Sequence, residues 1–353
     1  MNTVIQSNCD SMVPADRILV LKWSAMGDLA IASCAFEDIR NAYPEAQITL
    51  DTLPPWQQLY EQDPRFDHLQ CFDLRRGGVA AARMWLRAAA RARYDLVLDL
   101  QTTDRSRAMI GIANWCGRTI PYRAGNRAGW PYNLAPPNSL SEPRDALQIA
   151  RGTLAAAGIP AKTDVPWLYA SEDLIIGANA LLDNHGLSGQ RFAVFLPGCQ
   201  AAGYLKRWGT HNYARLAERL VATHVDRIVL LGGPDEVKDC QDITAAAQVP
   251  VTNLCGQTAL LQIAPICAQA TVVVANDTGT AHLAAAADIP MVVVCGPTDP
   301  RRVLPAGPRV RAAQVALPCI NCYRKTCAHH SCMRLLTPER VMLEVARALH
   351  TGG

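Results

Sequence analysis

The chain has 353 residues, of which 50% are hydrophobic and 18% are charged, and its formal net charge is +3. This length allows two domains of ordinary size, each with a sizeable core. The small net charge does not by itself indicate nucleic-acid binding, and no uninterrupted apolar run of about 18 residues is present to span a membrane. Residues 1–16 lack the basic start and apolar run of a signal peptide, so we expect them to be a disordered tail.

Strands and helices alternate along the first half of the chain, which is the βαβ pattern of a parallel sheet. A helix follows the first strand and ends before Pro44, because Ile31, Ala35 and Ile39 share one face at helical spacing. Asp28 therefore lies at the carboxyl end of the first strand, where ligands bind in open α/β sheets. A carboxylate in a first helical turn is also stabilised by the helix dipole alone. We expect strands near 18–21, 47–51, 69–72, 95–101 and 119–122.

Arginines are concentrated between residues 75 and 127. Arg105 and Arg107 follow the strand expected near 95–101, and Arg123 and Arg127 lie in a loop rich in Gly and Pro. Guanidinium groups suit carboxylates and phosphates, so these four can bind an acidic ligand. A second group shares an Ala-rich helix and is interpreted as a solvated helical face; it consists of Arg83, Arg87, Arg91 and Arg93.

The second half repeats the alternation, with a helix over 172–184 at the junction. Strands are expected near 192–196, 227–231, 251–254, 271–275 and 290–295, with helices from about 211, 235, 258 and 280. The sequence thus predicts an α/β fold with Rossmann-like, doubly wound domains over 17–170 and 171–353. Neither half contains a G-x-G-x-x-G fingerprint, which argues against a dehydrogenase.

A turn after the strand near 271–275 has the composition of an anion site. Amide groups at a helix start bind phosphates, and the dipole there is positive. Gly279 lets a phosphate approach the backbone, Thr278 and Thr280 add hydroxyl groups, and His282 lies about one turn further on. The alternative is an ordinary cap formed by Asp277 or Thr278, with His282 a surface residue.

Two further segments carry candidate chemistry. Lys206 and Arg207 stand in the loop after the strand near 192–196, although most such basic pairs are solvated. Four cysteines follow a spacing compatible with a tetrahedral zinc or iron site, but the four-residue gaps are looser than paired C-x-x-C motifs. We assign no metal ligand, and the question of a structural metal stays open. The cluster is Cys319-x2-Cys322-x4-Cys327-x4-Cys332.

The ordered set of motifs resembles glycosyltransferase family 9, the heptosyltransferases of the lipopolysaccharide core. The set comprises Ser24-Ala-Met-Gly-Asp28, Lys206-Arg-Trp208, Gly232-Gly-Pro-Asp235 and Asn276-Asp-Thr-Gly-Thr-Ala-His282. Cys295-Gly-Pro-Thr-Asp-Pro300 and the cysteine cluster are also similar to that family. The resemblance extends over residues 17–349.

This resemblance implies a GT-B architecture, two Rossmann-like domains facing a cleft. It implies inverting transfer of a heptose from ADP-heptose to an acidic inner-core lipopolysaccharide acceptor, with no cofactor. The acceptor would bind domain 17–170, and the nucleotide sugar would bind domain 171–353. We expect the enzyme in the cytoplasm or peripherally on the cytoplasmic face of the inner membrane, with no nucleic-acid partner.

The resemblance also assigns roles to residues. Asp28 would be the general base and Lys206 would neutralise the departing diphosphate. The acidic ribose partner would be Asp235, with Glu236 as the alternative. The remaining donor contacts would be Asp277, Thr278, Gly279, Thr280 and His282, and the acceptor contacts would be Arg105, Arg107, Arg123 and Arg127.

Two other classes of function stay open. One is a GT-B transferase or epimerase that uses another sugar nucleotide. The other is a nucleic-acid-binding module with a cysteine-rich metal loop. The basic residues lie far from the cysteines in sequence, and the aromatic content of 6% is low for base stacking, which argues against the module.

Overall fold

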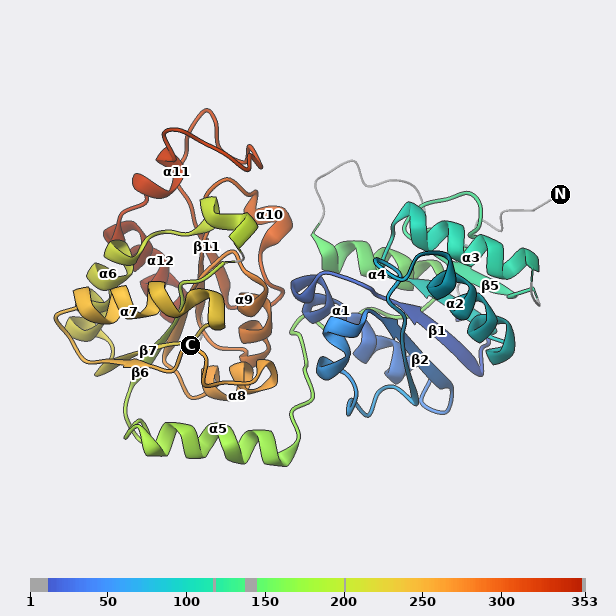
Figure 1. Ribbon diagram of the computed structural model, residues 1–353, viewed down its shortest axis with the longest axis horizontal. Coiled ribbons are helices and arrows are strands. Elements are labelled where there is room, and N and C mark those ends of the chain that lie inside the picture. The colour runs from blue at the N-terminus through green and yellow to red at the C-terminus, as the bar shows by residue number, and fades with distance from the viewer. Residues whose placement is uncertain (1–11, 117–118, 137–144, 200, 351–353) are drawn as a thin grey trace. The chain divides into compact units, whose positions relative to one another are not determined.

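The computed structural model describes residues 12–116, 119–136, 145–199 and 201–350, and the chain forms two compact units, Met1–Tyr169 and Ala170–Gly353 (Figure 1). Each unit contains one parallel sheet with helices between successive strands. The expected α/β fold is therefore confirmed. Among the helices of the described ranges, none combines the length and apolarity needed to span a bilayer.

The N-terminal unit has a five-stranded sheet in the order β3-β2-β1-β4-β5. Leu21, the last residue of β1, is in register with Asp51 of β2 and Asp99 of β4, so both carboxylates lie at the carboxyl edge of the sheet. The strands are β1 (Arg17–Leu21), β2 (Gln47–Thr52), β3 (His68–Cys71), β4 (Leu96–Asp99) and β5 (Tyr122–Ala124).

Two pairs of helices accompany this sheet, since α1 packs against α4 and α2 packs against α3. From β1 the strands are added toward one edge of the sheet as far as β3, and β4 and β5 are then added on the other side of β1. Because the crossovers are right-handed, α1 lies on one face of the sheet and α2 and α3 lie on the opposite face. Ile31, Ala35 and Ile39 are buried on α1, as their spacing predicts. The helices are α1 (Met26–Ala42), α2 (Gly78–Ala92), α3 (Asp104–Cys116) and α4 (Ala146–Ala156).

The expected N-terminal tail lies mostly outside the described residues, which begin at residue 12. Val13 is buried, its amide donates to the Ala157 carbonyl, and its own carbonyl accepts a hydrogen bond from the Tyr43 hydroxyl at 2.6 Å. The packed part of the chain therefore starts before residue 17.

The C-terminal unit has a six-stranded sheet in the order β11-β10-β9-β6-β7-β8. Its strands are β6 (Phe192–Leu196), β7 (Arg227–Leu230), β8 (Val251–Asn253), β9 (Val272–Asn276), β10 (Met291–Val294) and β11 (Val310–Ala313). Its helices are α5 (Glu172–Asn184), α6 (Thr210–Thr223), α7 (Val237–Ala246), α8 (Ile263–Cys267), α9 (Gly279–Ala284), α10 (Pro300–Val303), α11 (Ser331–Arg334) and α12 (Pro338–His350).

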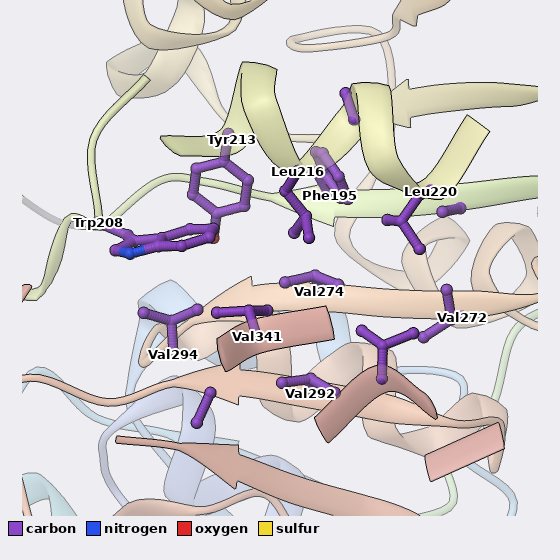
Figure 2. Packing of buried hydrophobic residues seen from close by; sticks show 14 of the residues in the cluster. Phe195, Trp208, Tyr213, Leu216, Leu220, Val272, Val274, Val292, Val294 and Val341 are labelled. Carbon is purple, nitrogen blue, oxygen red and sulfur yellow. The ribbon is translucent and has the colours of Figure 1, made fainter. Parts of the chain in front are cut away.

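The core of this unit lies between the sheet and the helices α6 and α12. Figure 2 shows Tyr213, Leu216 and Leu220 of α6 and Val341 of α12 packed around the valines of β9 and β10. Fully burying one such aliphatic side chain stabilises a fold by about 1.5–3 kcal/mol. The strand β11 and the helix α12 were not expected from the sequence.

Candidate active site

Charged side chains converge at the carboxyl edge of the N-terminal sheet. Lys22 directly follows β1, its side chain is buried, and its Nζ donates to the Leu100 carbonyl at 3.0 Å. Burial lowers the pKa of Lys22, while the carboxylates of Asp28 and Asp99 oppose that shift. A buried ammonium group therefore stands beside Asp28.

Asp28 lies in the first turn of α1, at the carboxyl end of β1 as the sequence predicts. Its Oδ2 accepts a hydrogen bond from the Ala25 amide at 3.0 Å, which fixes the carboxylate against the start of the helix. The side chain is partly exposed. This carboxylate is thus both held in place and open to a ligand.

The two neighbouring carboxyl groups serve the fold instead. Asp51 is fully buried, and its two oxygens accept hydrogen bonds from the indole N–H groups of Trp23, at 2.7 Å, and Trp85. Burial raises the pKa of Asp51 to about 7. Asp99 is also buried and accepts hydrogen bonds from the Tyr132 hydroxyl at 2.5 Å and from Ser106 at 2.7 Å. Asp28 is therefore the member of this group that a substrate can reach.

Three of the four predicted acceptor arginines lie around the start of α3. Arg105 donates to the Leu74 carbonyl at 2.9 Å, and Arg107 donates to the Trp130 carbonyl at 2.5 Å. Arg127 pairs with Asp104 at 2.5 Å, and both side chains are exposed. The guanidinium group of Arg107 also lies over the Tyr132 ring, 5.2 Å from its centroid. All three side chains retain further N–H donors for an anionic ligand.

Arg123 differs from these three because its guanidinium group is buried and used within the loop 119–136. Its Nε donates to the Pro131 carbonyl at 2.7 Å, and its Nη1 donates to the Ile120 carbonyl. Burial lowers the pKa of Arg123. The structure therefore corrects the expectation for Arg123, whose guanidinium group is directed to the carbonyls that close the loop and not to solvent.

In the C-terminal unit, Lys206 and Asp277 form an ion pair at the carboxyl edge of the sheet. The Nζ of Lys206 lies 2.8 Å from the Oδ2 of Asp277. Asp277 directly follows β9 and its side chain is 6% exposed, whereas that of Lys206 is 31% exposed. The pair joins two segments 71 positions apart and leaves the ammonium group accessible from solvent.

The predicted anion turn begins at this pair. Thr278 is the N-cap of α9, and Thr278, Gly279 and Thr280 are partly exposed. Amides in a first helical turn have no carbonyl four residues earlier to accept their hydrogen bonds. His282 is buried, at 8% exposure, so the alternative of a surface histidine is wrong.

Asn276 aligns this turn with the loop that carries Lys206. It accepts a hydrogen bond from the buried Tyr213 hydroxyl at 3.0 Å, and its side-chain amide donates to the carbonyls of Pro197 and Gly198 at the end of β6. Sequence reasoning quoted Asn276 within a motif but gave it no role. The sequence signal for this role is an asparagine at the end of an apolar strand, one position before an acidic residue.

The residues after Lys206 serve the fold. Arg207 donates to the Cys199 carbonyl at 2.8 Å and pairs with Asp239 at 2.9 Å. Trp208 is buried, and its indole N–H donates to the Leu336 carbonyl at 2.7 Å. Lys206 is therefore the basic side chain of this triplet that is directed to the candidate site.

Glu236, not Asp235, lies against the strand ends. Asp235 is exposed, whereas a carboxylate oxygen of Glu236 accepts a hydrogen bond from the Gly233 amide at 2.6 Å. The Glu236 side chain crosses Gly198 so closely that a Cβ there would lie 1.9 Å from its Cγ. Together with Lys206, it is among the charges that act on the Cys199 thiol.

The cysteine cluster packs beside the same loop. Cys319 and Cys322 are exposed, and among the described residues no three His, Cys, Asp or Glu side chains are placed to hold a metal ion. His330, within the cluster, places its Nε2 2.7 Å from the carbonyl of Leu205, the neighbour of Lys206. Tyr323 donates its amide proton to the Pro297 carbonyl at 2.9 Å. The segment thus buttresses the loop that carries Lys206.

Comparisons with known proteins identify relatives of this chain. The model of glycosyltransferase family 9 (heptosyltransferase) matches residues 83–332. Lipopolysaccharide heptosyltransferase 2 of Salmonella typhimurium is 28% identical, over 96% of this chain and 99% of its own length. The Escherichia coli K12 protein of the same name is 27% identical, over 93% and 97%.

Solved structures support the architecture. The ADP-heptose lipopolysaccharide heptosyltransferase II of E. coli has a TM-score of 0.71 at 23% identity, covering 95% of this chain and 99% of that one. A family 9 glycosyltransferase from Veillonella parvula has a TM-score of 0.77 at 18% identity, covering 96% and 98%. These likenesses confirm the expected GT-B fold.

Proposed function

The chain belongs to glycosyltransferase family 9, and from this premise we propose that it transfers a heptose from ADP-heptose to an acidic inner-core sugar of lipopolysaccharide. It is a glycosyltransferase, and its relatives named lipopolysaccharide heptosyltransferase 2 match nearly its whole length. The observation that carries the donor assignment is the Lys206–Asp277 pair at the start of a partly exposed turn whose amides can bind an anion. These features together support a nucleoside diphosphate sugar as the donor.

In the proposed reaction the C-terminal unit, over 171–353, holds the nucleotide sugar. Lys206 and the amides of Thr278, Gly279 and Thr280 contact the diphosphate and balance the charge that grows on it as it leaves. Asp277 keeps the flexible lysine at the turn before the donor arrives. His282 belongs to the same group of donor contacts.

Glu236 is proposed as the ribose partner in place of Asp235. A carboxylate accepts hydrogen bonds from the two ribose hydroxyls, as in other nucleotide-binding α/β folds. The Glu236 side chain lies over the end of β6 near Lys206, whereas Asp235 is directed to solvent.

Asp28 of the N-terminal unit is proposed as the general base. It takes the proton of the acceptor hydroxyl while that oxygen forms a bond to the anomeric carbon. The bond from this carbon to the diphosphate oxygen breaks on the opposite face, so the anomeric configuration inverts. A carboxylate that is fixed by a backbone amide yet partly exposed supports this role.

The acceptor is proposed to bind the N-terminal unit, over 17–170. Arg105, Arg107 and Arg127 surround the start of α3 with donors that suit phosphate and carboxylate groups. A lipopolysaccharide precursor is a lipid, so the enzyme would work at the cytoplasmic face of the inner membrane through peripheral contact.

The deciding experiment is calorimetric titration of the protein with ADP, UDP and GDP, followed by mass analysis of the product formed with ADP-heptose and a core acceptor. We expect ADP to bind most tightly and a product heavier by one heptose. Tighter binding of UDP or GDP would contradict the donor assignment and favour a transferase that uses another sugar nucleotide.

A further inference from the structure

The outer sides of α2 and α3 expose large apolar side chains. On α2, Val79 is 68% and Met84 is 56% exposed. On α3, Ile112 is 39% and Trp115 is 86% exposed. Single exposed hydrophobic residues are ordinary on protein surfaces, but two adjacent helices that each expose such residues need an explanation.

These side chains lie on the same side of the N-terminal unit. The helix α2 buries Ala81, Trp85 and Ala89, which recur every four residues, and α3 buries Ile110 and Ala113 in the same core. The two helices pack against each other, and Figure 1 shows them side by side over the sheet. Residues opposite the buried stripes therefore point away from the sheet in a common direction.

The same surface carries a concentration of positive charge. Between Leu74 and Tyr94 the chain has six arginines and no acidic residue. Arg83, Arg87 and Arg91 are exposed and follow Val79 at intervals of four, so they line the outer side of α2. Within the described ranges, none of these three forms an ion pair.

We propose that the outer face of α2 and α3, defined by Val79, Arg83, Met84, Arg87, Arg91, Ile112 and Trp115, docks on an anionic lipid bilayer. Exposed arginines that form no ion pair can bind anions, and the exposed apolar side chains beside them gain free energy when they leave water. Helices that lie in the plane of a membrane interface combine these two features, and tryptophan is enriched at that depth.

A bilayer explains this surface better than a protein partner does. The centres of protein interfaces are depleted of charge, whereas here three arginines share the outer side of α2 with the exposed Val79 and Met84. Lipid headgroups can meet each guanidinium while acyl chains meet the neighbouring apolar side chain. This inference rests on the proposed function in one respect, since an enzyme with a lipid acceptor must reach the membrane surface.

The test is flotation of the full chain with vesicles that contain no acceptor glycolipid. One set is pure phosphatidylcholine and the other also contains phosphatidylglycerol. We expect binding to the anionic vesicles, weaker at high salt because exposed charges are screened. Replacing Arg83, Arg87 and Arg91 by glutamate should lower the partition coefficient roughly tenfold or more. Trp115→Ser should also lower it, with little change in the salt dependence.

A matched control reverses three exposed basic residues of the C-terminal unit, namely Lys238, Arg334 and Arg340, and so changes the net charge equally. This control should retain vesicle binding, and thermal melting should show that all variants are folded. Equal loss in the control and in the α2 variant would overturn the proposal, as would absence of wild-type binding. Dimer dissociation by Trp115→Ser without an effect on vesicles would assign the surface to a second copy.

Failure of this proposal can be separated from failure of the proposed function. Transfer to a deacylated, water-soluble acceptor should proceed at the wild-type rate in the α2 variant, since its replaced arginines are outside the candidate site. Vesicle binding without any heptose transfer would refute the function alone. Transfer without vesicle binding would refute the docking surface alone.

Discussion

The ion pair between Lys206 and Asp277 predicts an unusual response to mutation. In the proposed donor site, Lys206→Ala would remove one charge-assisted hydrogen bond to the diphosphate, which is worth about 1.5–3 kcal/mol. It also leaves the carboxylate of Asp277, which is only 6% exposed, without its partner at 2.8 Å and next to the incoming phosphates. Repulsion between such neighbouring charges adds to the loss, so ADP affinity should fall by about 2–4 kcal/mol in all.

The double variant Lys206→Ala/Asp277→Asn separates these two contributions. It still lacks the ammonium group, but the repelling carboxylate is gone, so ADP should bind more tightly to it than to Lys206→Ala alone. The two substitutions would then show a coupling of at least about 0.5 kcal/mol in a double-mutant cycle. Calorimetry with ADP measures all four proteins. Wild-type affinity in Lys206→Ala, or additive losses in the double variant, would refute the assignment.

Three further outcomes are expected. Asp28→Asn should lower turnover by roughly 10²–10⁴ with unchanged ADP affinity, the range for a general base, and near-normal turnover would exclude Asp28. Glu236→Gln should weaken ADP binding measurably by calorimetry while Asp235→Asn should not, and the reverse result would restore Asp235 as the ribose partner. Because burial raises the pKa of Asp51 to about 7, the folded state binds its proton more tightly than the unfolded state, and stability from this residue falls as pH rises from about 4 to 7. Asp51→Asn should therefore be less destabilising at about pH 7 than at about pH 5, by about 2–3 kcal/mol in urea unfolding, and a constant difference would show that Asp51 is ionised throughout.

The alternation of strands and helices was predictable because buried parallel strands are apolar and β-branched over their whole length. Val272–Val274 is such a run, and all five residues of β9 are buried. The edge strand β11 has only Val-Arg-Ala-Ala, which carries no such signal. The helix α12 does carry a sequence signal, since Val341, Val345 and Ala348 share one face at helical spacing.

For the candidate site, the sequence indicated which turns contain candidate functional residues. It did not indicate which side chain of each turn is directed to the candidate site. Asp28 lies in the helical turn after β1, and Lys206 lies in the loop after β6, as expected. Arg123 and Glu236 show the limit, because each differs from a neighbouring candidate only in the direction of its side chain. That direction depends on local contacts, such as the carbonyls around Arg123 and the glycine beneath Glu236.

The buried polar residues at both carboxyl edges explain how the exposed ones are kept in position. A buried carboxylate or amide is costly unless its hydrogen bonds are satisfied. Asp51 meets this condition through two tryptophans, and Asn276 through a tyrosine and two carbonyls. Each residue thereby ties the segments that flank a strand end into one arrangement. Because a reacting group must be held close to its productive geometry, the rigidity supplied by these buried residues is what makes a partly exposed Asp28 or Lys206 useful.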